Sequence, residues 1–293
     1  MELRAAMTRV DKILSYDVMA ILGQGARSII YAVKDKKNNV FALKHVIKGE
    51  NDDQRYIDQA VLEHQIAQAV NHGSLRKSFK LIRRRELLRV HEVIVLMELV
   101  DGMTLEHYQF KSLIDFCQVM QKVADGLRAM HDAGYVHADI KPNNIMVDEK
   151  QVVKLIDFGQ SCPIGTIKPR IQGTPDYIAP EQVKRKQITP HTDIYNLGAT
   201  MYFLLTRQHV PTVMPIAEGM SVALKSDRVC PPPRNIDPKI PPALSGLVMQ
   251  CIELDAAERP QSMNLVYQRL GMALSQLTRG GDPEPLPAVK PGL

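Results

Sequence analysis

The chain opens with helical periodicity, changes to strand-like alternation and returns to helical periodicity in its second half. Leu3, Met7, Val10 and Leu14 recur at helical spacing, so we expect a short amphipathic helix at residues 1–14 that packs on the next domain or docks on a partner. Short runs rich in β-branched residues then predict strands separated by turn residues. They cover residues 18–22, 28–34, 40–46, 78–82, 87–90 and 93–99. From these six runs we expect five antiparallel strands, because one strand continues through Val90 and joins two of the runs.

Helical patterns account for most of the remaining chain. One interrupts the strands at residues 54–70, where apolar residues mark one side. Others follow at residues 113–131, 194–205, 244–254 and 263–277. The pattern predicts an α+β fold, with a small antiparallel β lobe carrying one helix and a larger, mainly α-helical lobe. The Pro/Gly-rich tail at residues 278–293 is expected not to pack.

Length and composition support a globular chain. Its 293 residues allow two modest domains or one larger two-lobed unit, and 45% apolar with 24% charged residues is typical of a folded core. No apolar run is long enough to cross a bilayer, and the first residues lack the apolar region of a secretory signal. We therefore expect a cytoplasmic protein without membrane insertion.

Cysteine spacing and net charge narrow the kinds of site and partner that the chain could have. The four cysteines lie far apart without a CxxC pair, which argues against a zinc site and a disulfide framework. The net charge of +5 suits a phosphate-bearing partner, although many basic enzymes bind no nucleic acid, and none is expected here. The basic run at residues 83–85 is interpreted as a solvated turn, or alternatively as a docking patch for an acidic partner.

Two features of the predicted β lobe could serve a phosphate ligand. Gly23 and Gly25 lie between two strands, where glycines let backbone N–H groups approach phosphate oxygens. A simple hairpin turn explains them equally well. Lys44 ends an apolar strand and needs a counter-charge, which Glu63 of the following helix could supply. The alternative is that both are ordinary surface residues.

The most informative segments lie in the second half of the chain. They are HADIKPNN at residues 137–144, KLIDFG at 154–159 and GTPDYIAPE at 173–181. With Lys44 and the glycine pair, these ordered motifs resemble the protein kinase family, and most closely the bacterial Hanks-type serine/threonine kinases. The resemblance extends from about Tyr16 to Leu277. It implies a small lobe at residues 16–98, a hinge at 98–102 and a large lobe at 103–277.

The resemblance also implies a reaction and the residues that perform it. A serine/threonine protein kinase transfers the γ-phosphate of ATP to protein Ser or Thr hydroxyls, with Mg²⁺ or Mn²⁺ as metal, and commonly phosphorylates itself. Asp139 is expected to accept the hydroxyl proton or to orient the hydroxyl, and Lys141 to meet the γ-phosphate. Lys44, oriented by Glu63, is expected to hold the other phosphates. The hard oxygen ligands expected for the metal are Asn144 and Asp157.

Further positions are expected to bind the nucleotide or to brace the fold. The resemblance assigns to nucleotide binding Leu22, Gly23, Gln24, Gly25, Ala26, Arg27, Ser28, Ile30, Ala42, Lys44, Met97, Glu98, Leu99, Val100 and Met146. Asp193 resembles the aspartate that braces the catalytic loop, and Glu181 with Arg259 resembles a buried ion pair. Thr174 is expected to hydrogen-bond near Asp139 and Lys141.

The sequence departs from the family pattern at several positions. Ala138 replaces an arginine that, in many kinases, pairs with a phosphorylated activation-loop residue. We therefore expect activity without phosphorylation of that loop through this route. Ser28 replaces a third glycine, and Arg27 lies where an aromatic residue is common. Asn143 lies where basophilic kinases often carry glutamate, so a preference for basic substrates is unsupported.

Two other functions remain open at this point. A pseudokinase would bind partners without catalysis, but Lys44, Glu63, Asp139, Asn144 and Asp157 are all present. A small-molecule phosphotransferase shares the Asp/Asn and metal chemistry, and the segment at 173–181 argues against it. The sequence does not indicate an oligomeric state.

Overall fold

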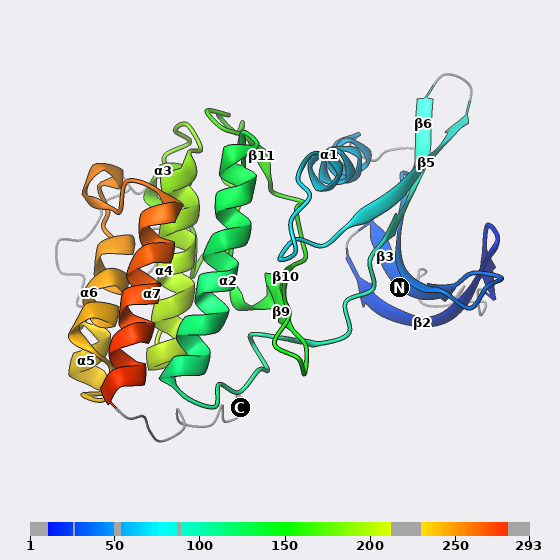
Figure 1. Ribbon diagram of the computed structural model, residues 1–293. Coiled ribbons are helices and arrows are strands. Elements are labelled where there is room, and N and C mark those ends of the chain that lie inside the picture. The colour runs from blue at the N-terminus through cyan, green and yellow to red at the C-terminus, as the bar shows by residue number, and fades with distance from the viewer. Residues whose placement is uncertain (1–10, 26, 50–53, 87–88, 212–229, 281–293) are drawn as a thin grey trace. The chain divides into compact units, whose positions relative to one another are not determined.

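The computed structural model describes residues 11–25, 27–49, 54–86, 89–211 and 230–280. The chain divides into two compact units (Figure 1). The small unit comprises Met1–Asn71 and Arg76–Asp101, and the large unit comprises His72–Leu75 and Gly102–Leu293. The boundary at Asp101 falls within the segment predicted as a hinge. The short excursion at His72–Leu75 was not predicted.

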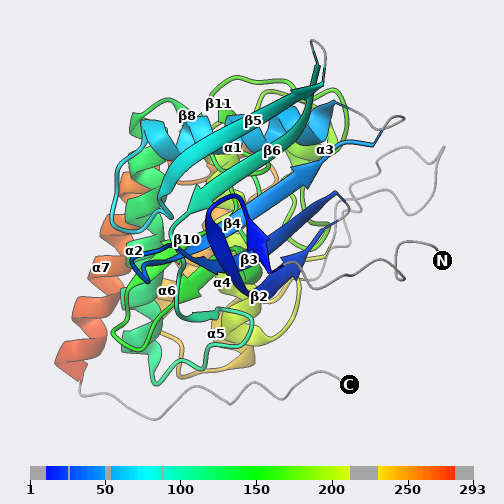
Figure 2. The ribbon, with the colours of Figure 1, turned by 90° about the vertical axis from the view of Figure 1, so that its right-hand side faces the viewer.

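The small unit contains a curved, fully antiparallel sheet (Figure 2). Its strands are β1 (Lys12–Ile13), β2 (Tyr16–Gln24), β3 (Ser28–Lys34), β4 (Val40–Ile47), β5 (Ser78–Glu86) and β6 (Arg89–Met97). They lie in the order β1-β2-β3-β4-β6-β5. The described sheet thus has one strand more than the five expected.

The additional strand corrects the N-terminal prediction. Residues 1–10 of the expected helix lie outside the described residues. Lys12 and Ile13 pair with Asp17 and Tyr16 as β1, and Leu14 adopts a left-handed backbone with φ of 56°. The helix predicted for residues 1–14 is therefore wrong in its described part, because pairing with β2 overrides the local periodicity.

Alternation along the strands gives the sheet two apolar faces. One face carries Ala42, Val46, Val93, Val95 and Met97, which pack with helix α1 (Arg55–Ala69). The other face carries a second cluster that includes Ile13 of β1. Successive side chains of a strand point to opposite faces. Lys44 and His45 of β4 therefore lie on different sides of the sheet.

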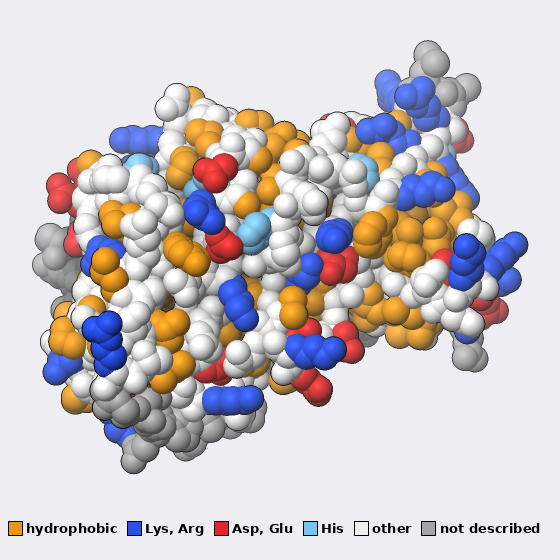
Figure 3. Space-filling model, in the orientation of Figure 1, with side chains coloured by type: hydrophobic (Ala, Val, Ile, Leu, Met, Phe, Trp, Pro, Cys, Tyr) orange, Lys and Arg blue, Asp and Glu red, His pale blue; other side chains and the backbone are white. Residues whose placement is uncertain are grey.

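The basic run at residues 83–85 lies within β5 and is not a turn. Arg83 pairs with Val93 and Arg84 with Glu92 of β6, and after a register shift Arg85 pairs with Val90. Arg84 also forms an ion pair with Glu92 at 3.2 Å. Figure 3 shows Lys and Arg side chains gathered at the hairpin end of the small unit. The solvated-turn interpretation is thus wrong in its secondary structure.

Helices form most of the large unit. The long ones are α2 (Leu113–Asp132), α4 (Pro190–Thr206), α6 (Pro242–Cys251) and α7 (Met263–Gly280). Short ones are α3 (Pro180–Val183), α5 (Pro233–Ile236), η1 (Pro142–Asn144) and η2 (Ala256–Glu258). Helices α2, α4 and α7 run side by side (Figure 1). Helix α7 continues through Gly280, so the predicted tail begins later than residue 278.

Short strands position the loops of the large unit. They are β7 (Met103–Thr104), β8 (Tyr135–Val136), β9 (Ile145–Val147), β10 (Val153–Leu155) and β11 (Cys162–Pro163). Strands β7, β9 and β10 form one small sheet, and β8 pairs with β11. The segments at 137–144 and 156–161 thus begin and end at paired strands. Together with the helices, this architecture confirms the predicted α+β fold class.

Close helix packing in the large unit depends on a glycine. A β-carbon at Gly198 of α4 would lie 2.5 Å from the Cβ of Cys251 in α6, which is closer than packed carbon atoms approach. Glycine at this position therefore lets α4 and α6 meet. Within the described ranges, no helix combines the length and apolarity needed to cross a membrane.

Candidate active site

The loop at residues 137–141 is held in place by the Asp193 side chain of α4. The backbone N–H groups of His137 and Ala138 donate to its carboxylate at 2.9 and 2.7 Å, and His131 lies 2.8 Å from it. Burial by itself would raise the pKa of Asp193, but the hydrogen bond and charge of His131 outweigh it and lower the pKa. The buried carboxylate therefore stays charged and braces the loop, as the sequence predicted.

Ala138 lies in an unusual backbone conformation within this loop. Its φ of 61° is left-handed, which costs a residue with a β-carbon about 1–3 kcal/mol. Both polar backbone groups are held, because the N–H donates to Asp193 and the carbonyl accepts from Gln182 at 2.8 Å. Its side chain is fully buried. Gln182 was not identified from the sequence.

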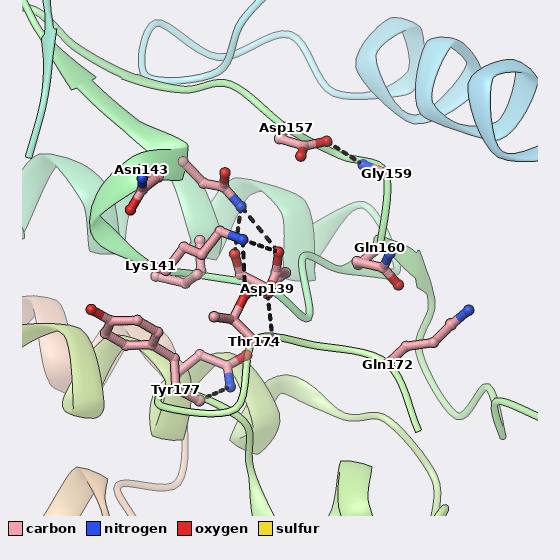
Figure 4. Close-up of polar contacts among 12 residues, drawn as sticks. Asp139, Lys141, Asn143, Asp157, Gly159, Gln160, Gln172, Thr174 and Tyr177 are labelled. Atoms are coloured by element: carbon pink, nitrogen blue, oxygen red, sulfur yellow. Dashed lines mark hydrogen bonds and ion pairs between the residues drawn. The ribbon is translucent and has the colours of Figure 1, made fainter. Parts of the chain in front are cut away.

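Asp139 lies at the centre of a compact polar cluster (Figure 4). The backbone N–H and the hydroxyl of Thr174 donate to its Oδ1 at 3.1 and 2.9 Å. Lys141 Nζ lies 3.1 Å from Oδ2 and donates to the Thr174 hydroxyl at 2.8 Å. The contact predicted for Thr174 is confirmed. The cluster places a carboxylate beside a fixed ammonium, an arrangement suited to acting on an anionic group and a hydroxyl.

Asn144 and Asp157 are brought together by the backbone. Asn144 Nδ2 donates to the backbone oxygen of Asp139 at 2.8 Å and to its Oδ2 at 3.2 Å. The backbone carbonyl of Asn144 accepts a hydrogen bond from the N–H of Ile156 at 3.0 Å. This contact brings Asp157, the next residue, beside Asn144. Since Nδ2 is committed to Asp139, Oδ1 of Asn144 lies on the opposite side of the amide. Together with the Asp157 carboxylate it offers the hard oxygens that Mg²⁺ prefers.

The small unit provides an ion-pair network around Glu63 of α1. Lys44 Nζ lies 2.5 Å from Glu63 Oε2, and Arg76 donates to Oε1 at 2.6 Å. All three side chains are largely buried. The surface-pair alternative for Lys44 and Glu63 is therefore excluded. Arg76 was missed, because nothing in the local sequence distinguishes it from a surface cation.

The residues expected around the nucleotide's phosphates and base have varied environments. Gly25 N–H donates to the Ser28 carbonyl at 2.7 Å, which closes a tight turn between β2 and β3, and Ala26 lies outside the described residues.

Leu22 is 52% exposed on β2, whereas Met97 is 1% exposed and pairs with Ala42 in the core. Glu98 exchanges two hydrogen bonds with Lys77. Gln24, Arg27, Ile30, Leu99, Val100 and Met146 are half-buried or exposed.

Arg259 connects several segments of the large unit through its buried guanidinium. It is 1% exposed and bonds Glu181 through two nitrogens at 2.8 and 3.0 Å. Backbone carbonyls of His191, Leu254 and Glu253 accept from the same guanidinium, and Tyr195 lies under it. The predicted buried ion pair is confirmed, and its contacts tie α3 to the segment before α7.

A family model for the protein kinase domain matches residues 16–270. The chain belongs to the protein kinase family. This confirms the resemblance carried by the motifs at 137–144, 154–159 and 173–181. Asp139, Lys141 and Thr174 of the polar cluster and Lys44 and Glu63 of the ion-pair network lie at motif positions of the family, whereas Arg76 does not.

Relatives of this kinase domain include bacterial serine/threonine kinases. It is 29% identical over 266 residues to the "Probable serine/threonine-protein kinase CPE1738" of Clostridium perfringens, covering 86% of this chain and 38% of that protein. For the serine/threonine-protein kinase pkn3 of Myxococcus xanthus the identity is 26%, covering 84% and 48%. For PrkC of Bacillus subtilis it is 24%, covering 83% and 38%. The chain thus spans less than half the length of these relatives.

Proposed function

We propose that this kinase domain transfers the γ-phosphate of ATP to Ser or Thr hydroxyls of proteins, including its own. The arrangement of Asp139, Lys141 and Thr174 carries the proposal, because it combines a proton acceptor, a cation and a fixed geometry. The similarity to serine/threonine kinases supports the same acceptor class. We place the reaction in the cytoplasm, where ATP is supplied.

The chemistry follows from the charges of this cluster. The acceptor hydroxyl attacks the γ-phosphorus, the bond to the β-phosphate oxygen breaks, and ADP leaves. Asp139 orients the hydroxyl and takes up its proton. Lys141 lies within hydrogen-bond distance of Asp139 and can neutralise charge on the transferred group. Thr174 fixes the positions of both side chains, because its N–H and hydroxyl donate to Asp139 and its hydroxyl accepts from Lys141.

The remaining residues would hold the nucleotide and its metal. Asn144 and Asp157 are proposed to bind Mg²⁺, or Mn²⁺, which when bound neutralises phosphate charge. Lys44 is proposed to bind the α- and β-phosphates, with Glu63 fixing its ammonium at 2.5 Å. The backbone of residues 23–28 would cover the phosphates. Adenine is assigned to Leu22, Ile30, Ala42, Met97 and Met146, with residues 98–100 as its backbone partner.

Replacing Glu63 with Gln is expected to weaken ATP binding about tenfold, since a charge-assisted hydrogen bond contributes about 1.5–3 kcal/mol. The substitution leaves Lys44 and Arg76 as neighbouring cations without the carboxylate between them. Calorimetric titration with a non-hydrolysable ATP analogue and Mg²⁺ measures the effect. Glu92→Gln is the matched control, because Glu92 pairs with His45 and Arg84 in the same sheet. An unchanged Kd in Glu63→Gln contradicts the assignment of Lys44.

The transfer itself is tested with γ-labelled ATP. The purified domain is incubated with Mg²⁺, alone, with a generic protein acceptor and with a panel of small hydroxylated metabolites. We expect label on Ser and Thr residues of protein, located by mass spectrometry. Label only on a metabolite would instead identify a small-molecule phosphotransferase. Binding of ATP without any transfer would identify a pseudokinase.

A further inference from the structure

Lys168 is a buried lysine in the segment that follows Asp157. Lys168 is 9% exposed, although a lysine ammonium is strongly hydrated and costly to bury. Its Nζ donates to the backbone carbonyl of Gln160 at 2.5 Å and lies 3.4 Å from the Gln160 side-chain oxygen. Gln160 follows the Asp157-Phe158-Gly159 turn directly (Figure 4). Lys168 therefore closes a loop back onto the turn that carries a proposed metal ligand.

The charge of Lys168 interacts with titratable groups on both sides of Ala138 in the catalytic loop. Burial lowers the pKa of Lys168, and the nearby Cys162, Asp139 and Asp193 act in the opposite direction. Burial also lowers the pKa of His137, and the charge of Lys168 adds to that effect. His137 and Asp139 flank Ala138. A cation from the segment after Asp157 thus acts electrostatically on the loop that contains Ala138, where the family pattern has arginine.

Residues 161–166 of this segment are held by contacts between neutral groups, and Arg185 donates to the Pro169 carbonyl at 3.3 Å. Cys162 pairs with Val136, and the backbones of Gly165 and Thr166 exchange hydrogen bonds with Ile188. Ser161 donates to the His137 carbonyl at 3.3 Å. Lys168 adds the contact that joins this part of the segment back to Gln160.

We propose that Lys168 is a positioning residue for phosphoryl transfer, which keeps the Asp157 turn in place without a phosphate on the activation segment. This inference rests on the proposed kinase function. It gives a structural reason for the activity expected without loop phosphorylation. In kinases that carry the arginine, a phosphate brings the opposite charge to it; here the segment supplies its own cation to a region that contains Asp139 and Asp193.

The test replaces Lys168 with Met, which keeps an aliphatic chain but removes the charge and the hydrogen bonds. Because the substitution removes the cost of burying the ammonium but also leaves the Gln160 carbonyl without its donor, we expect the melting temperature to change little. We expect kcat to fall about tenfold or more, since small displacements of catalytic groups have effects of that size. The KM for the protein acceptor is expected to change little. Phosphatase-treated wild type, confirmed by mass spectrometry, is the reference enzyme.

Amide hydrogen exchange provides a readout independent of activity. Peptides spanning residues 157–168 are expected to exchange faster in Lys168→Met than in wild type. Lys186→Met is the matched control, because Lys186 is an exposed lysine of the same unit, and it is expected to change neither kcat nor exchange.

The possible results separate the inference from the proposed function. An unchanged kcat and unchanged exchange in Lys168→Met overturn the positioning role. A fall in kcat that parallels a loss of melting temperature also overturns it, since that indicates a purely structural residue. Loss of wild-type activity on phosphatase treatment overturns the phosphate-independent part. If wild type transfers no phosphate, the proposed function fails, while the exchange data still decide whether Lys168 holds the segment.

Discussion

Replacing Asp139 with Asn is expected to lower kcat for transfer to Ser or Thr by about a thousandfold, within the range of about 10²–10⁴ for general acid–base groups. Asparagine has nearly the same shape but cannot take up the hydroxyl proton. Its amide nitrogen would also face donors, because Lys141 and Asn144 donate to Oδ2 and Thr174 donates to Oδ1. One of these contacts must become a donor–donor pair. Single-turnover measurement with γ-labelled ATP gives the chemical step directly.

The same variant distinguishes catalysis from binding and folding. The Kd for Mg²⁺ and an ATP analogue is expected to stay within about threefold of wild type, since Asp139 acts on the acceptor hydroxyl. Asp132→Asn is the matched control, because Asp132 is exposed at the end of α2. Full transfer activity in Asp139→Asn would remove Asp139 from the mechanism. An equal loss in the control would point to a general effect of the substitution.

Replacing Arg259 with Met is expected to lower the free energy of unfolding by about 3–5 kcal/mol, as found when one partner of a buried ion pair is removed. Arg259 donates to Glu181 twice and to three backbone carbonyls. Methionine fills part of the volume but satisfies none of these acceptors. Urea denaturation followed by circular dichroism measures the change. Arg279→Met, at the exposed end of α7, is expected to have little effect.

The acid dependence of stability reports on the same ion pair. Burial by itself would raise the pKa of Glu181, but its bonds with Arg259 outweigh burial and lower the pKa below its usual value of 4.5. A lowered folded-state pKa contributes stability above the unfolded pKa, and this contribution is lost as the pH falls toward the folded value. In Arg259→Met burial dominates and the pKa of Glu181 rises. We therefore expect the loss of stability in acid to shrink or reverse in this variant; an unchanged acid dependence would contradict it.

Local patterns were sufficient for most elements. The strand predicted at residues 28–34 matches β3, and the helix predicted at 113–131 differs from α2 by one residue at its end. Such elements have strong period-2 or helical periodicity over their full length. The two-residue strand β1 is too short to show a period. It exists through pairing with β2, and the local helical spacing of residues 1–14 pointed elsewhere.

By itself, the sequence determined the family, the α+β architecture and the residue types of the reaction. Motif chemistry depends on spacing within short segments, so HADIKPNN and IDFG identify Asp139, Asn144 and Asp157 without knowledge of the fold. Only the tertiary structure identified two further cations, Arg76 and Lys168, as buried residues with fixed partners. Arg76 reaches Glu63 from another element, and Lys168 turns back to Gln160. In sequence they are indistinguishable from surface lysines and arginines, because burial and a fixed partner arise only when distant segments pack together.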